Sequence, residues 1–133
     1  MKKRIYIITL FCFYALVSCG PSVPTSSSAE KSYDQYATLA QALRSVPGIT
    51  VSGTDSNPNI ILRGGGGGGI AEVQPLFVID NVVIGNSYAQ ANSVITPTNI
   101  KSIKVLNGMS ATNRFGQEGR GGVIMITSKS SSK

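Results

Sequence analysis

The sequence predicts an α+β domain in which a small mixed β-sheet is accompanied by short helices. Three apolar runs rich in β-branched residues occupy its second half, and each is too short for an ordinary helix. Gly, Asn and Pro residues separate these runs, as expected of strands joined by turns. A chain of 133 residues is long enough for one such domain preceded by targeting material.

Residues 1–18 are predicted to be a secretory signal peptide. A cationic start, Met1-Lys-Lys-Arg4, precedes an apolar run at residues 5–17 that is shorter than the roughly 20 residues needed to span a bilayer. Leu16-Val-Ser-Cys19-Gly20 matches a lipobox, in which Cys19 becomes the first mature residue and carries diacylglycerol and an acyl chain such as palmitate. The alternative is an ordinary signal peptide whose cleavage site contains a Cys. Since Cys12 would be removed with the signal, no intramolecular disulfide is expected.

The charge of the mature chain is modest. The full sequence has 12 Lys and Arg against 6 Asp and Glu, and removing Lys2, Lys3 and Arg4 leaves an excess of three. These cations are scattered rather than gathered into a stripe with aromatics, so no nucleic-acid partner is expected. Residues 19–32 are rich in Ser, Pro and small residues, which predicts a lipid anchor and a flexible tether with a reach of about 20 Å. The domain then spans residues 33–133.

The first element of the domain is predicted as a helix within residues 33–46. Its apolar side chains share one face at a helical period: Tyr36, Leu39, Ala40, Leu43 and Val46. Asp34 or Ser32 is expected to cap its start, and Pro47-Gly48 to end it.

Two short strands are predicted next, at residues 49–51 and 59–64. Six consecutive glycines, Gly64–Gly69, begin at the end of the second of them. A phosphate-binding loop would need a Lys and a Ser or Thr before a helix, but Ile70-Ala-Glu-Val73 comes instead. The glycine run is therefore predicted to be a loop.

A β-hairpin is predicted around the turn signal Asp80-Asn81, with strands at residues 76–79 and 82–84. Residues 85–94 are polar and are predicted to form a loop. A helical turn at 97–100 leads to a strand at 102–106, in which Ile103 and Val105 face the same side. The remaining predicted elements are a turn at 107–108, a helical turn at 110–115 and a last strand at 121–127.

The motifs in this order resemble the plug domain of TonB-dependent outer-membrane receptors, especially the SusC-like kind of Bacteroidetes. The resemblance covers about residues 39–129 and rests on five segments: 42–51, 59–64, 75–81, 100–116 and 121–129. Asp80-Asn81 stands where the family has Asp-Gly. The resemblance implies a four-stranded mixed sheet with short helices, folded inside a β-barrel and closing its pore.

No enzyme, cofactor or metal site is expected. The chain contains no His, and its acids are not spaced for acid–base work or for a calcium cage. Asp80 is expected to shape the hairpin turn by bonding to the backbone rather than to catalyse a reaction. Arg63 is a candidate for binding an anion or for pairing with Asp80 or Glu118, unless it is simply solvated or packed.

Four residues are candidate partner contacts: Arg63, Arg114, Phe115 and Arg120. The last three lie where the family has a Tyr-Gly-x-Arg motif, and the resemblance implies that Arg114 and Arg120 touch a barrel wall. Phe115 is expected to be a core or edge aromatic.

The sequence departs from the receptor pattern, since no barrel-forming residues follow Lys133 and the tether contains no evident TonB box. We therefore predict a lipid-anchored, non-enzymatic plug module that assists outer-membrane transport, with a barrel receptor as its partner. No acidic cluster follows Cys19, which favours the periplasmic face of the outer membrane. The alternatives are a free-standing module that binds a peptide or small ligand, and a degenerate receptor remnant.

Overall fold

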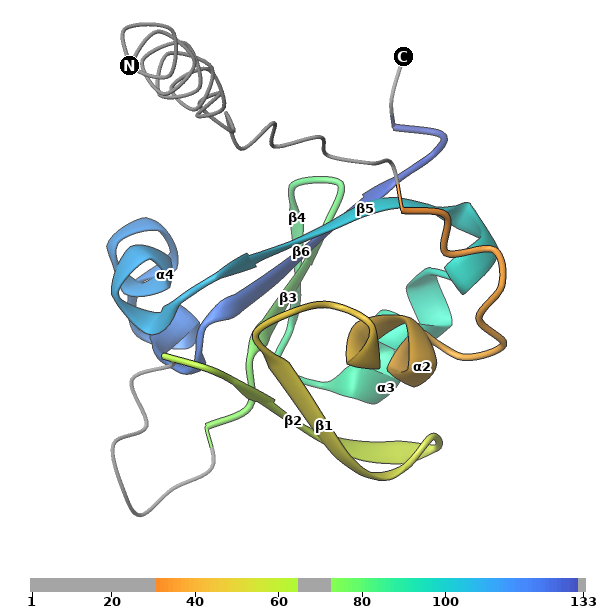
Figure 1. The fold of residues 1–133 in the computed structure, drawn as a ribbon. Coiled ribbons are helices and arrows are strands. Elements are labelled where there is room, and N and C mark those ends of the chain that lie inside the picture. Colours follow the sequence, from red (N-terminus) through yellow and green to blue (C-terminus); the bar gives the residue numbers. More distant parts are fainter. Residues whose placement is uncertain (1–30, 65–72, 132–133) are drawn as a thin grey trace, which may run out of the picture.

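Residues 31–64 and 73–131 are described by a computed structural model of the chain (Figure 1). The predicted signal peptide, Cys19, the tether up to residue 30 and glycines 65–69 lie outside the described residues. The elements of the described part are, in order, α2 (Leu39–Arg44), β1 (Ile49–Thr54), β2 (Asn57–Leu62), β3 (Leu76–Ile79), β4 (Val82–Gly85), α3 (Tyr88–Val94), η2 (Pro97–Asn99), β5 (Ile100–Leu106), α4 (Gly108–Phe115), η3 (Gly116–Gly121) and β6 (Val123–Ser128).

The predicted α+β class is confirmed. Four strands form a mixed sheet in the order β4-β3-β6-β5, in which β3 is parallel to β6 and the other pairs are antiparallel. Strands β1 and β2 form a separate antiparallel pair, with Ile49 opposite Leu62 and Thr54 opposite Asn57. All four residues of the central strand β3 are buried. A strand that is covered on both faces buries every side chain, and its sequence is therefore apolar throughout.

Both faces of the mixed sheet are covered. Phe77, Ile79 and Ile124 contribute to the larger apolar cluster, which also contains side chains of α2, α3 and β2. Leu76, Val78 and Val123 contribute to a smaller cluster with Ala111 and Phe115 of α4. Figure 1 shows α2 and α3 on one side of the sheet and α4 at the opposite end of β5 from η2.

The first helix is shorter than predicted and begins elsewhere. It spans Leu39–Arg44, and its N-cap is Thr38, whose Oγ1 accepts a hydrogen bond from the backbone N of Gln41 at 3.3 Å. The predicted caps Ser32 and Asp34 lie before the helix, where the Ser32 hydroxyl donates to Asp34 Oδ2 at 3.1 Å. The helix starts at Thr38 because its hydroxyl can satisfy an otherwise unpaired helix N–H.

The central residues of the apolar face predicted for this helix are buried. Leu39, Ala40 and Leu43 have no exposed surface. Tyr36 and Val46, also predicted on the helical face, lie outside the helix. Val46 nevertheless belongs to the larger apolar cluster, and Tyr36 packs against that cluster.

The prediction of a loop at residues 85–94 is wrong, because Tyr88–Val94 form helix α3. Tyr88, Ala91 and Ile95 are buried and lie three and four residues apart, which is the spacing of one helical face. The polar residues between them conceal this pattern. Burial of three apolar side chains against the sheet outweighs the weak helix propensity of the Asn and Ser residues in this segment.

The predicted β-hairpin is present. Asp80 and Asn81 both have positive φ, 49° and 67°, as the two central residues of a type I′ turn require. The segment 108–115, predicted as a single helical turn from 110, is the eight-residue helix α4. The last strand starts at Val123 instead of Gly121 because residues 116–121 form the 3₁₀ segment η3.

Candidate functional site

The candidate contact surface lies at the end of the molecule formed by α4 and η3, residues 108–121, which we call the α4–η3 end. Helix α4 begins at Asn107, whose Oδ1 accepts a hydrogen bond from the backbone N of Ser110 at 3.1 Å. Ala111 is fully buried against the sheet. Gly116, with φ of 66°, ends the helix, a conformation that glycine adopts without strain.

Three of the predicted contact residues lie on the α4–η3 end. Arg114 and Arg120 are exposed, whereas Phe115 is half-buried against the smaller apolar cluster. The guanidinium carbon of Arg114 lies 5.4 Å from the centroid of the Phe115 ring, within the range of a cation–π contact. Phe115 is thus an aromatic at the edge of the core that supports an exposed cation, and the contact role of these residues stays a prediction.

Arg63, the fourth predicted contact residue, directly follows strand β2, near the same end. The carbonyl of the following Gly64 accepts a hydrogen bond from the backbone N of Gly108 at 3.1 Å, which ties β2 to the start of α4. The Arg63 side chain is exposed. Within residues 31–64 and 73–131 it forms no ion pair with Asp80 or Glu118, so the predicted pairing is wrong.

Three glycines join the α4–η3 end to the rest of the fold, and we call them the glycine junction: Gly119, Gly121 and Gly122. A Cβ on Gly119 would lie 2.6 Å from the carbonyl O of Ala111, and a Cβ on Gly121 would lie 2.6 Å from the carbonyl O of Gln74. Real Cβ atoms do not approach backbone atoms this closely. The junction therefore allows η3 to pack directly against the backbone of α4 and of the segment before β3.

Gly122 brings β2 into the same junction. A Cβ at this position would lie 2.6 Å from Leu62 Cδ1 and 3.0 Å from the carbonyl O of Leu106, and its φ is 91°. Leu62 of β2 consequently covers the start of β6. This contact fixes the separate β1–β2 pair on the mixed sheet, so the glycine junction links the two sheets and α4.

Asp80 has a structural position, although not the one predicted. Its Oδ1 accepts a hydrogen bond from the backbone N of Ser128 at 2.8 Å, and its own backbone N donates to the carbonyl O of Ile126 at 2.9 Å. The side chain thus bonds to the end of β6 rather than within its own turn. These bonds hold the β3–β4 turn against the neighbouring strand.

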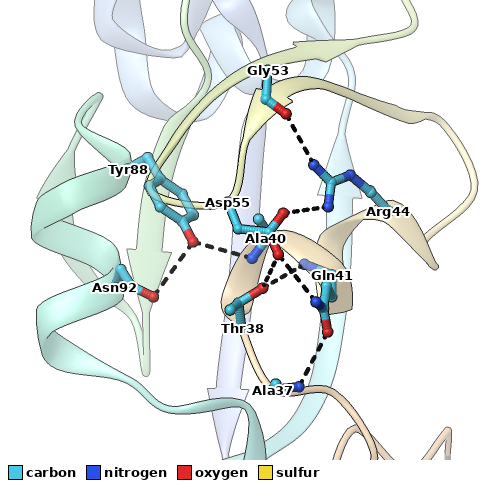
Figure 2. Close-up of polar contacts among 9 residues, drawn as sticks. All are labelled: Ala37, Thr38, Ala40, Gln41, Arg44, Gly53, Asp55, Tyr88 and Asn92. Carbon is cyan, nitrogen blue, oxygen red and sulfur yellow. Dashed lines mark hydrogen bonds and ion pairs between the residues drawn. The ribbon is translucent and has the colours of Figure 1, made fainter.

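A polar network around Asp55, at the β1–β2 turn, was missed by the sequence reasoning (Figure 2). Asp55 Oδ2 accepts hydrogen bonds from Thr38 Oγ1 at 3.1 Å and from Gln41 Nε2 at 3.0 Å, and Oδ1 pairs with Arg44. Asp55 therefore binds both ends of α2. The spacing Thr38-x-x-Gln41, that of a capping box, could have located the start of α2 but does not indicate its contact with Asp55.

Tyr88 makes a second polar link to α2. Its hydroxyl accepts a hydrogen bond from the backbone N of Ala40 at 3.1 Å and lies 3.5 Å from Asn92 Oδ1 (Figure 2). Burial raises the pKa of this phenol above its ordinary value, so it remains a neutral donor near neutral pH. Tyr88 joins α3 to α2 and satisfies a helix N–H that would otherwise lack a partner.

We expect the free energy of unfolding to be constant between about pH 5 and 7 and to fall below about pH 4. The pKa values of three carboxyl groups lie below their ordinary value: that of Asp34 because Lys129 donates to it, that of Asp55 because Arg44 does, and that of Asp80 because the Ser128 backbone N–H does. Since the folded-state pKa is the lower one, their contribution is present above the unfolded-state pKa and is lost as the pH falls through the folded-state value. No His is present to titrate between pH 5 and 8.

Urea unfolding at pH 7, 5, 4 and 3 tests this expectation. The Asp80→Asn variant should show a shallower loss between pH 5 and 3, because one of the three carboxyl groups no longer titrates. Equal stability at pH 3 and pH 7 would contradict the assigned bonds.

The described residues offer no metal centre and no helical membrane span. Residues 31–64 and 73–131 contain no group of three or more His, Cys, Asp or Glu side chains that could hold a metal ion. In the same ranges, no helix is both long and apolar enough to cross a membrane. What the α4–η3 end does offer is an exposed surface that carries two cations, Arg114 and Arg120, and one carboxylate, Glu118.

The fold is that of a small α+β domain, and its α4–η3 end exposes Arg114 and Arg120. Residues 21–123 match the family model described as TonB-dependent Receptor Plug Domain. This match covers well over half of the chain, and the chain belongs to that family.

Curated relatives support the same assignment. The chain is 31% identical over 112 residues to TonB-dependent receptor P26 of Formosa agariphila, a match that covers 81% of this chain and 11% of the relative. It is 35% identical over 92 residues to TonB-dependent receptor SusC of Bacteroides thetaiotaomicron, covering 63% and 9%. It is 34% identical over 106 residues to a hemin receptor of Yersinia pestis, covering 77% and 14%. The chain thus spans about a tenth of the length of these relatives.

Proposed function

We propose that this chain is a non-enzymatic plug module that works at the outer membrane by contacting a β-barrel protein. The match to the plug family over residues 21–123 supports this proposal most directly. The four-stranded mixed sheet of the chain is consistent with that family. Two of the relatives are named TonB-dependent receptors, which makes outer-membrane transport the process in which such a module would act. The barrel partner would determine which substrate is transported.

The proposed module is tied to the membrane through Cys19. Support for this step comes from the lipobox Leu16-Val-Ser-Cys19 and from the Ser- and Pro-rich residues that follow it. Two or three acyl chains make a firm anchor, because each buried CH₂ contributes roughly 0.8 kcal/mol. The absence of an acidic cluster after Cys19 favours the periplasmic face of the outer membrane.

The α4–η3 end is the proposed contact with the barrel. Arg114 and Arg120 are exposed there, and Phe115 supports Arg114 from the edge of the core. Because the glycine junction packs this end directly against backbone atoms, the contact surface is already ordered before it meets a partner. A surface that needs no ordering loses less conformational entropy on binding.

Co-purification from outer membranes tests the proposal. A tagged chain should retain a β-barrel protein, identified by mass spectrometry of the eluate. Arg114→Glu should reduce the retained barrel protein by at least about fivefold, because it reverses a charge at the contact surface. The control Lys104→Glu makes the same charge change at an exposed site on β5 and should retain as much as the unaltered chain. A barrel protein missing from the wild-type eluate would contradict the proposal.

A second candidate function is a free-standing module that binds an extended peptide. Strand β4 lies at the edge of the mixed sheet, and two of its apolar side chains, Val82 and Val83, are 61% and 46% exposed. An edge strand with apolar side chains can pair with a further strand. Thermal stabilisation of the chain by short apolar peptides, combined with the absence of a barrel protein from the eluate, would favour this function over the first.

A further inference from the structure

We propose that Asn107 is a modification site at which the side-chain amide is hydrolysed to a carboxylate without an enzyme, and that hydrogen bonds at the start of α4 control the rate. Asn107 is exposed and is the N-cap of α4, and Gly108 follows it. The inference concerns the α4–η3 end but goes beyond the proposed function, because it needs no barrel partner.

The sequence at this position favours deamidation. In the first step, the backbone N of Gly108 forms a bond to Cγ of Asn107, and the side-chain nitrogen leaves as ammonia after taking up the proton of the backbone N. Water then opens the cyclic imide at either of its two carbonyl groups, which gives Asp or its isomer isoaspartate. A side chain on the following residue hinders the attack, and Gly has none. Asn107 is the one Asn of the sequence that precedes a Gly.

The fold holds the two reacting groups apart. The backbone N of Gly108 donates to the carbonyl O of Gly64 at 3.1 Å, and Asn107 Oδ1 accepts from the backbone N of Ser110 at 3.1 Å. Gly108 is also buried, which keeps its N–H from water and base. Since one group is bound to the segment after β2 and the other to the helix, both bonds have to break before the two atoms can meet. The reaction therefore requires local opening of the start of α4.

The glycine junction limits this opening. Figure 1 shows the end of β2 beside α4. Ala111 is fully buried, and its backbone N donates to the carbonyl O of Asn107 at 2.8 Å, which closes the first turn of the helix. A Cβ on Gly119 would lie 2.6 Å from the carbonyl O of Ala111, so η3 packs directly on this turn. Loosening the junction should therefore raise the population of the open form that reacts.

The two products should have different effects on α4. Asp is as good an N-cap as Asn, and its negative charge is favourable at a helix N-terminus. Isoaspartate instead adds a methylene group to the main chain just before Gly108, which displaces that residue relative to Gly64. The isoaspartate form should thus lose the bond between the β2 segment and α4, whereas the Asp form should keep it.

Peptide mass spectrometry of the purified chain, incubated at about pH 8, tests the control by the fold. Conversion at Asn107 should be at least about tenfold slower in the folded chain than in the chain unfolded by guanidinium chloride, because only the open form reacts. Asn113 is the internal control: it is exposed on the same helix, but Arg114 follows it, so it should convert far more slowly in the unfolded chain. Hydrogen exchange of the Gly108 N–H requires the same opening and should show a similar protection.

Two glycine variants form a matched pair. Gly121→Ala places a Cβ 2.6 Å from the carbonyl O of Gln74 and loosens the junction without altering Asn107, so it should speed conversion in the folded chain severalfold. Gly53→Ala strains the β1–β2 turn, where φ is 84° and a Cβ would lie 3.1 Å from the carbonyl O of Asn57. This control should change the rate by less than about twofold, because it acts away from α4.

Guanidinium chloride below the unfolding transition provides a second measurement, which does not depend on the folding of Gly121→Ala. Conversion at Asn107 should rise before circular dichroism detects global unfolding, because the start of α4 opens locally. Equal conversion in the folded and unfolded chains, or equal conversion at Asn107 and Asn113 in the unfolded chain, would overturn the proposal.

Thermal unfolding of the separated products tests the assigned bonds. Asn107→Asp, which reproduces one product, should melt within about 4 °C of the unaltered chain, and the isoaspartate form should melt at a lower temperature than this variant. Equal melting of the two products would contradict the link between β2 and α4. Each of these outcomes is independent of co-purification with a barrel protein, so failure here leaves the proposed function standing.

Discussion

Gly121→Ala is expected to lower the free energy of unfolding by about 3 kcal/mol. Its Cβ would lie 2.6 Å from the carbonyl O of Gln74 and 2.7 Å from that of Val73. Both neighbours are backbone atoms next to the buried strand β3, so they cannot rotate away as a side chain could. A loss of this size is a large part of the roughly 5–15 kcal/mol that stabilises a typical domain, and the melting temperature should fall by more than about 10 °C.

Gly48→Asn is the control for this change. Gly48 has φ of 88°, and a Cβ at this position would have no neighbouring atom within 4 Å. Asn tolerates this backbone conformation better than other residues with a side chain. Its cost should stay below about 1 kcal/mol. Urea unfolding of the two variants measures the difference. Equal losses would show that close packing at the glycine junction does not hold the α4–η3 end to the sheet.

Cys19→Ser is expected to abolish acylation of the chain. The lipobox reading makes Cys19 the sole attachment point, so labelled palmitate should be incorporated into the wild-type chain and not into this variant. The mature wild-type chain should also start at residue 19 and carry the mass of its acyl groups. Without them, the Ser- and Pro-rich tether would no longer keep the domain at the membrane.

Cys12→Ser is the matched control, because it changes the only other Cys of the chain. Cys12 lies within the predicted signal peptide, so this variant should be processed and acylated like the wild-type chain. Palmitate incorporation that persists in Cys19→Ser, or is lost equally in both variants, would contradict the lipobox prediction.

The strands of the mixed sheet could be predicted because their signals are local. Leu76–Ile79 and Val82–Gly85 flank Asp80-Asn81, and two adjacent residues that tolerate positive φ specify a tight hairpin. The resemblance to the plug family implied a four-stranded mixed sheet, but the strand order β4-β3-β6-β5 was not predicted. The parallel pairing of β3 with β6 joins residues more than 40 positions apart, and no local pattern specifies such a pairing.

Helix boundaries were harder to predict from the sequence, because short helices depend on tertiary contacts. Helix α3 was predicted as a loop, although Tyr88, Ala91 and Ile95 have a helical spacing, because polar residues such as Gln90 and Asn92 lie among them. Helix α2 begins at Thr38 rather than at Asp34, whose carboxylate instead pairs with Lys129, 95 positions away. A partner so distant in sequence cannot be deduced from capping preferences.

The candidate site, too, was only partly predictable from the sequence. Arg114, Phe115 and Arg120 were found through the family motif, and all three lie on one end of the fold. The glycine junction that supports them was not predicted, since in the sequence Gly119 lies between predicted elements and Gly121 begins the predicted last strand. Their role depends on carbonyl groups of Ala111 and Gln74 that only the folded chain brings within reach.

Photo-crosslinking in intact cells tests most directly whether the α4–η3 end contacts a barrel. A photoreactive residue in place of Arg114 samples this end, and one in place of Thr50, which is exposed on β1, samples a surface outside it. We predict an adduct with a β-barrel protein of the outer membrane from position 114 and none from position 50. No barrel adduct from position 114, or equal adducts from both positions, would contradict the proposed role of this chain as a plug module.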